Sequence, residues 1–363
     1  MGALSILRTP AAPDPARSPL WGGVDRLIDR TRDLDRLRLH GVQLLAANRW
    51  RERGLEVPAS LLQEERVATV AALTAATVLR RARNAYDGPI IVQKGPEAAA
   101  AYPDPALRPF ADLDIIVPDA AAAQRALCAD GFQEVGDPSR YLGIHHLRPL
   151  LLGDLPLRVE IHSAPKWPER LSPPPFGALL EAAMPSSTGV EGVLALARSQ
   201  HALVLAAHSW AHRPLRRLGE LVDVAAVSDG LDRGELASLA RSWGFTRVWG
   251  TTIDAADSLL LLEARDTTWP LRIWARHLAE IRDRTVLESH LERWLSSFSA
   301  VPPHIALLIW AETLADELRP AADETWGQKL SRTGRAVRNA FTSRQEHAAG
   351  LGPDAQRWRR SPR

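Results

Sequence analysis

Residues 110 to 117 read Phe-Ala-Asp-Leu-Asp-Ile-Ile-Val, an apolar run with two carboxylates near its start. The β-branched residues at its end predict a strand. Because side chains alternate along a strand, Asp112 and Asp114 share one face, with roughly 7 Å between their Cα atoms. Two carboxylates placed in this way can share a divalent cation. An acid-x-acid pair is also common at a solvated strand end, so the pair alone leaves both interpretations open.

Two shorter apolar runs lie on either side of this stretch. Residues 90–92 read Ile-Ile-Val, and residues 157–162 read Leu-Arg-Val-Glu-Ile-His. Glu160 stands between apolar neighbours, and because burying an unpaired carboxylate is costly, it needs either an arginine or a metal ion as its partner. His162 falls on the Glu160 face by the period of two, where it orients a substrate hydroxyl, acts as a base, or is an ordinary core histidine.

The turn after the first run reads Gln-Lys-Gly-Pro, and it contains Lys94 and Gly95. A glycine at a strand-to-helix turn lets the backbone approach a ligand, and the free amides of a helix start favour an anion. Lys94 is one of three lysines in the chain, and its point charge suits a phosphate. Lys166 and Lys329 have no comparable motif around them. Arg108, four residues before Asp112, either bridges to Glu160 or contacts a phosphate.

The rest of the chain has mainly helical character. Amphipathic periodicity predicts helices over 23–50 and 59–84, before the strands. From about residue 173 we expect the strands to disappear and six helices to follow, over residues 190–213, 215–229, 233–243, 247–265, 269–294 and 305–318. The predicted fold class is α+β, with a small sheet between N-terminal helices and a C-terminal helical domain. The predicted division is a flexible tail at 1–22, a helical region at 23–86, an α+β module at 87–170, a helical domain at 171–330 and a flexible basic tail at 331–363.

Composition excludes several classes of protein. The 363 residues carry 45 Lys and Arg against 43 Asp and Glu, and 45% are hydrophobic, which is enough to build a core. The single cysteine, Cys128, excludes a disulfide framework. Before residues 357–363 the arginines are scattered among acids, so we expect no nucleic-acid partner. No apolar run reaches the roughly 18 residues that span a bilayer, and the first 20 residues lack a secretory apolar stretch, so we predict a soluble cytoplasmic protein.

Residues 90–135, together with Val159-Glu160-Ile161-His162, resemble the uncharacterised bacterial nucleotidyltransferase family of the DNA polymerase β superfamily. The motifs that carry the resemblance are the Lys-Gly turn, the Arg-Pro-x-x-Asp-x-Asp strand and the Val-Glu-x-His strand. A looser likeness covers about residues 23 to 230, including the segment with His208, His212 and Asp223. Two departures stand out. Ser163 replaces a common tryptophan, and the turn has Lys-Gly where better-known superfamily members have Gly-Ser.

The resemblance implies a small mixed-sheet nucleotidyltransferase module that binds magnesium or manganese. It places the metal on Asp112, Asp114 and Glu160 and the phosphates on Lys94 and Gly95. We add Arg108 and His162 as candidate nucleotide contacts. The expected reaction moves a nucleoside monophosphate from a triphosphate, ATP in the first instance, to a small-molecule, sugar or peptide acceptor, and it releases pyrophosphate.

Two alternatives remain open at this stage. The fold can be kept without catalysis, as a module that binds a nucleotide or a partner. His201, His208 and His212 share one helix face, which could bind zinc, but their spacing is wrong for three ligands and we expect His208 or His212 to hydrogen-bond to the catalytic module instead.

Overall fold

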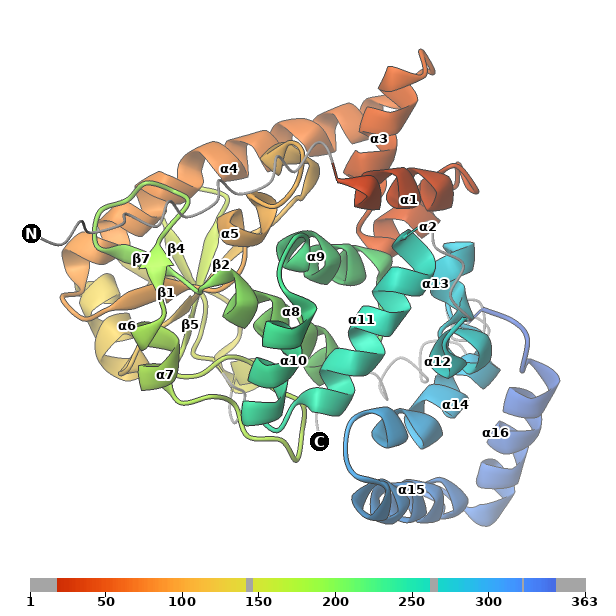
Figure 1. The fold of residues 1–363 in the computed structure, drawn as a ribbon. Helices are drawn as coiled ribbons and strands as arrows, with labels where there is room; N and C mark the ends of the chain where they lie inside the picture. The colour runs from red at the N-terminus through yellow and green to blue at the C-terminus, as the bar shows by residue number, and fades with distance from the viewer. Residues whose placement is uncertain (1–17, 142–145, 262–266, 322, 344–363) are drawn as a thin grey trace, which may run out of the picture.

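The structure is a computed structural model that describes residues 18–141, 146–261, 267–321 and 323–343. Seven strands form one mixed sheet in the spatial order β3-β4-β5-β2-β1-β7-β6, with helices around it (Figure 1). The strands are β1 (Ile90–Val92), β2 (Asp112–Ile116), β3 (Phe132–Glu134), β4 (Leu150–Leu152), β5 (Arg158–His162), β6 (Met184–Pro185) and β7 (Val193–Ala195). The predicted α+β class and mixed sheet are confirmed.

The centre of the sheet places three strands in the order β5-β2-β1. Strand β2 runs parallel to β5 and antiparallel to β1, and β1 runs parallel to β7. Helices cover both faces of the sheet, and β1 is accordingly a continuous apolar run, whereas β2 and β5 also carry charged or polar side chains. In β1 all three residues are buried.

Each face of the sheet has its own helical cover. On one face, Leu113, Ile115 and Val159 pack against α4 (Ala59–Ala85) and α6 (Ala120–Ala129), where small alanines of α4 allow close approach. On the other face, Ile91 and Ile116 pack against α7 (Phe176–Glu181) and α8 (Arg198–His212). The second face also carries Asp112 and Asp114, so α8 lies over the candidate site.

Of the two helices expected before the sheet, the one over 59–84 is confirmed as α4, and the one over 23–50 is broken into shorter helices. The range 23–50 contains the end of α1 (Pro19–Ile28), all of α2 (Leu34–His40) and most of α3 (Gln43–Glu52). The breaks have local causes, since Asp33 caps the start of α2 and Gly41 ends it in the left-handed conformation, with φ of 70°. Residues 1–17 of the predicted N-terminal tail lie outside the described residues.

Strands were predicted to end before residue 173, and this was wrong. Val193–Ala195 is β7, paired with β1, although it was assigned to a helix over 190–213, and α8 begins only at Arg198. A short apolar run has no periodicity that separates strand from helix. The boundary at 170/171 remains a prediction, and β6 and β7 of the sheet lie C-terminal to it.

The C-terminal part is helical, as expected, but the helices begin and end at other residues than predicted. Its helices are α9 (Leu218–Ser228), α10 (Arg233–Ser242), α11 (Thr246–Leu260), α12 (Trp269–Ile273), α13 (Arg276–Glu280), α14 (Val286–Leu295), α15 (Pro303–Leu318) and α16 (Trp326–Arg338). The predicted helix over 269–294 is three helices, because a Thr285–Glu288 capping box starts a new one. Helix α16 continues to Arg338 and so extends into the segment 331–363 that was predicted to be a tail. Residues 262–266 of the predicted fourth helix, and residues 344–363, lie outside the described residues.

None of the helices within the described ranges combines the length and apolar character that a bilayer crossing requires.

Candidate functional site

The parallel pairing of β2 and β5 builds the candidate site. In this register Asp114 lies opposite Glu160, and Ile116 lies opposite His162. Because both strands alternate with the same phase, the two acids and the histidine project from one face of the sheet.

Asp114 is the most buried acid of this site, at 2% exposure. His162 Nε2 lies 3.0 Å from its Oδ1 atom, and Lys94 Nζ lies 3.4 Å from its Oδ2 atom. Burial alone raises the pKa of a carboxyl, but the Lys94 charge and the His162 hydrogen bond outweigh it and lower the pKa of Asp114. Asp114 is therefore a buried carboxylate that is ionised at neutral pH.

The two neighbouring acids are shifted in the opposite direction. Burial and the Asp114 charge raise the pKa of Asp112 and of Glu160. His146 Nε2 lies 3.7 Å from Glu160 Oε2 and offsets part of this repulsion. Three acids that repel one another on one sheet face are an arrangement that a bound cation stabilises.

The residues present fit a divalent metal ion. Donor atoms of Asp114, Glu160 and His162 all lie within 4.8 Å of one another. Asp114 Oδ2 is buried and accepts no hydrogen bond among the described residues, and its ion pair with Lys94 Nζ spans 3.4 Å. Asp112 is outside this group of three, although its charge acts on both Asp114 and Glu160.

Lys94 and Gly95 lie in the turn between β1 and α5 (Pro96–Ala99), beside β2. Lys94 Nζ donates to His208 Nε2 at 3.0 Å, in addition to its ion pair with Asp114. Burial and the Lys94 charge lower the pKa of His208 well below its usual value, so the ring is neutral and accepts this proton. The expected hydrogen bond from His208 to the sheet module is confirmed.

The fold itself requires glycine at position 95, independently of any ligand. Its backbone has φ of 64° and ψ of −118°, and a Cβ built there would lie 3.2 Å from the Asp112 carbonyl oxygen. The space that a side chain would need is therefore taken up by β2.

Substituting Gly95 tests this packing. We expect Gly95→Ala to lower the free energy of unfolding by about 3 kcal/mol, because alanine cannot adopt this conformation without strain. Gly153→Ala is the matched control, since Gly153 also has a positive φ of 54° but no atom within 4 Å of a built Cβ. That change should cost about 1 kcal/mol. If urea denaturation shows that both variants lose the same free energy of unfolding, the result would contradict a tight contact at Gly95.

Arg108 pairs with a residue of the helical region. Its Nε and Nη2 atoms donate to the two carboxylate oxygens of Asp223 on α9, at 2.7 and 2.8 Å. Tyr102 donates its hydroxyl to the same carboxylate at 2.7 Å, and burial raises the pKa of this phenol, which keeps the proton in place. The predicted bridge from Arg108 to Glu160 is wrong. The structure links Arg108 to the turn only through Nη1, 3.4 Å from the Gly95 carbonyl oxygen.

Residues 28–260 match the model of a family described as uncharacterised nucleotidyltransferase. The match spans the sheet, the N-terminal helices from α2 onward, and the helices through α11. The chain belongs to this family. The resemblance noted in the sequence is thus confirmed, and the match reaches about 30 residues beyond the C-terminal limit expected from the motifs. No curated protein and no solved structure matches the chain.

Sequence reasoning did not place one further basic residue near this candidate site. Lys166 Nζ lies 2.9 Å from Nδ1 and 3.1 Å from Nε2 of His212, whose ring meets that of His208 edge to face, with 4.6 Å between ring centroids. Burial, with the charges of Lys94 and Arg216, lowers the pKa of Lys166 to about 8. The sequence around Lys166 carries no motif comparable to that of Lys94, yet the structure places Lys166 against His212 at the end of α8. The scarcity of lysine in the chain was the signal that could have marked it.

Lys329, by contrast, lies far from this site in the fold. It is buried on α16, and its ammonium group donates to the Glu317 carbonyl oxygen of α15. It is a structural residue of the C-terminal helices.

Proposed function

We propose that this chain is a magnesium-dependent nucleotidyltransferase that moves a nucleoside monophosphate from a nucleoside triphosphate to an acceptor hydroxyl or phosphate. Family membership supports the reaction class. The observation that carries the proposal is the ionised, buried Asp114, opposite Glu160 and in contact with Lys94. In the transfer, the acceptor oxygen bonds to the α-phosphorus as the bond from that phosphorus to pyrophosphate breaks.

Asp112, Asp114 and Glu160 are the proposed metal ligands, because magnesium prefers oxygen donors. When bound, the divalent cation neutralises phosphate charge and favours ionisation of the acceptor hydroxyl. We assign His162 a positioning role, since its Nε2 atom lies at hydrogen-bond distance from Asp114 and holds that carboxylate in place. Manganese binding distinguishes this set of three acids from the alternative set of Asp114, Glu160 and His162. With the three acids as ligands, Asp112→Asn should weaken manganese binding strongly, and His162→Gln only moderately.

Lys94 and Lys166 are the proposed phosphate contacts, with Gly95 and Arg108 shaping the turn. Both lysines are held by histidines of α8, so the helix that covers the sheet also positions the cations. Two ammonium groups beside a triphosphate would stabilise the charge that develops on the departing pyrophosphate. ATP is the triphosphate to test first.

The pH dependence of triphosphate binding tests Lys166. Below its pKa of about 8 Lys166 is charged and attracts phosphate, and above that value it is neutral. We therefore expect the dissociation constant to rise above pH 8, by up to about tenfold per pH unit. Lys166→Met should bind weakly at all pH values and lose this dependence, measured by calorimetry. The same pH profile in Lys166→Met and the parent protein would remove Lys166 from the phosphate site.

The proposed function is tested with four ribonucleoside triphosphates, with and without magnesium. We expect magnesium to strengthen the binding of at least one of them in calorimetry, and EDTA to reverse the effect. The protein is then incubated with that triphosphate, labelled at the α-phosphate, and cell extract, and label transfer and pyrophosphate are measured. Magnesium-dependent binding without transfer would support the non-catalytic binding module instead. If magnesium has no effect on triphosphate binding, the result would contradict both the transferase and a magnesium-dependent nucleotide-binding module.

A further inference from the structure

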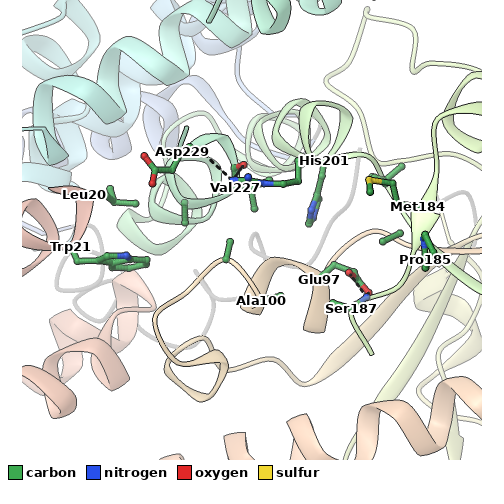
Figure 2. A pocket seen from close by; sticks show the side chains of 15 residues that line it. Leu20, Trp21, Glu97, Ala100, Met184, Pro185, Ser187, His201, Val227 and Asp229 are labelled. Carbon is green, nitrogen blue, oxygen red and sulfur yellow. Dashed lines mark hydrogen bonds between the residues drawn. The ribbon is translucent and has the colours of Figure 1, made fainter. Parts of the chain in front are cut away.

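A second cavity lies apart from the Asp114 site, at the opposite end of α8. Its volume is about 250 Å³, and it is lined by residues of α1, α5, the β6–β7 hairpin and the ends of α8 and α9 (Figure 2). None of the proposed metal or phosphate ligands lines it. His201 of this cavity precedes His208 by seven residues on α8, which is about 10 Å along the helix axis.

His201 gives this cavity a buried polar atom that lacks a hydrogen-bond partner among the described residues. The side chain is 4% exposed, and its Nε2 atom has no hydrogen-bond partner in the part of the chain that the structure describes. Burial lowers the pKa of His201 to about 4, so the ring is neutral at pH 7. A buried polar atom without a partner costs free energy, which a hydrogen-bonding ligand in the cavity would recover.

The charges that line the cavity favour a cation. The lining includes the carboxylates of Glu97 and Asp229 and one guanidinium, that of Arg198. Arg198 Nη2 is already bonded to the carbonyl oxygens of Val227 and Asp229, at 3.1 and 2.9 Å. With a neutral His201 the lining carries one net negative charge, which opposes phosphate groups and attracts an ammonium group.

The two carboxylates differ in how much of their bonding capacity is used. Glu97 accepts from the Ser187 backbone N–H at 3.2 Å and from the Ser186 hydroxyl. The Asp229 carboxylate has no hydrogen-bond or ion-pair partner within the described ranges. Asp229 is therefore the acid that can accept from a ligand.

An aromatic ring stands at the same end of the cavity as Asp229. In Figure 2, Trp21 and Leu20 lie at that end, and Met184 and Pro185 lie at the other. The Trp21 ring is half-buried and packs against Tyr102, with 5.1 Å between ring centroids. An aromatic face beside a carboxylate suits an ammonium group, and the apolar walls suit a hydrocarbon or ring body.

We propose that this cavity binds a small organic amine. The ammonium group lies between Trp21 and Asp229, the apolar body fills the space toward Met184, and a polar substituent meets His201. The site is distinct from the proposed triphosphate site, and the charges of the two sites select opposite ligands.

The test uses two indole probes of similar size and opposite charge, tryptamine and indole-3-propionate, titrated into the full-length protein. We expect tryptamine to bind with a micromolar to millimolar dissociation constant, at least about tenfold tighter than indole-3-propionate. Saturating magnesium and ATP should leave the tryptamine affinity unchanged. Equal affinities for the two probes, or displacement of tryptamine by ATP, would overturn the proposal.

Two variants locate the binding. Ala100→Phe adds a ring at an exposed position of the cavity wall and should abolish tryptamine binding without affecting ATP binding. Asp229→Asn should weaken tryptamine binding at least about tenfold and leave neutral indole unaffected. Tryptamine binding that is unchanged in Ala100→Phe would place the amine elsewhere and refute the assignment.

Discussion

Asp114→Asn is expected to abolish magnesium-dependent pyrophosphate release, with a loss on the order of a thousandfold or more. The substitution keeps the size of the side chain, and an amide oxygen can still accept from His162 Nε2. It removes the charge that holds Lys94 at 3.4 Å and, on our proposal, a metal ligand. The loss of pyrophosphate release would therefore come from the missing carboxylate charge and not from a change in the shape of the side chain.

Metal-dependent nucleotide binding gives this prediction a readout besides turnover. Asp114→Asn should bind triphosphate equally well with and without magnesium, because the affinity gained from the metal disappears. Lys94 keeps its hydrogen bond to His208, so we expect the variant to fold, as judged by circular dichroism.

Asp154→Asn is the matched control, on an exposed turn after β4. This variant should retain the parent rate and the parent response to magnesium. A folded Asp114→Asn protein that still released pyrophosphate at the parent rate would rule out the metal assignment.

The local parts of this site could be predicted from sequence because they depend on short-range periodicity. Alternation along a strand placed Asp112 with Asp114 and Glu160 with His162, and β1, β2 and β5 are strands in the structure. The adjacency of β2 and β5 could not be predicted in the same way. It arises from pairing between residues 46 apart in the chain, and no local pattern encodes that register.

The missed features have the same physical origin. Lys166 lies in a segment without regular secondary structure, so no period assigned it a face, and its contact with His212 depends on how α8 packs over the sheet. Strand β7 was missed because three apolar residues suit a strand or a helix equally, and its pairing with β1 decides between them. The partner of Arg108 lies on α9, 115 residues away, whereas the nearer Glu160 was the natural candidate from sequence.

The Arg108–Asp223 pair carries the second large prediction, on stability. Arg108→Met leaves a buried carboxylate facing only the Tyr102 hydroxyl, and breaking a buried ion pair in this way costs about 3–5 kcal/mol. For a region of this size the melting temperature should fall by roughly 10 °C. Asp223→Leu alone should cause a similar loss, because it leaves the guanidinium buried without its partner.

The double variant Arg108→Met/Asp223→Leu separates the structural role of Arg108 from a direct role in nucleotide binding. Replacing both partners of a buried ion pair with apolar side chains is often close to neutral, so most of the lost stability should return, as measured by thermal denaturation. If Arg108 acts only by joining α9 to the Gly95 turn, triphosphate affinity should return together with stability. Recovered stability with affinity still lost would show instead that the guanidinium itself contacts phosphate. A double variant as unstable as the single ones would contradict the ion pair as the main link between α9 and this turn.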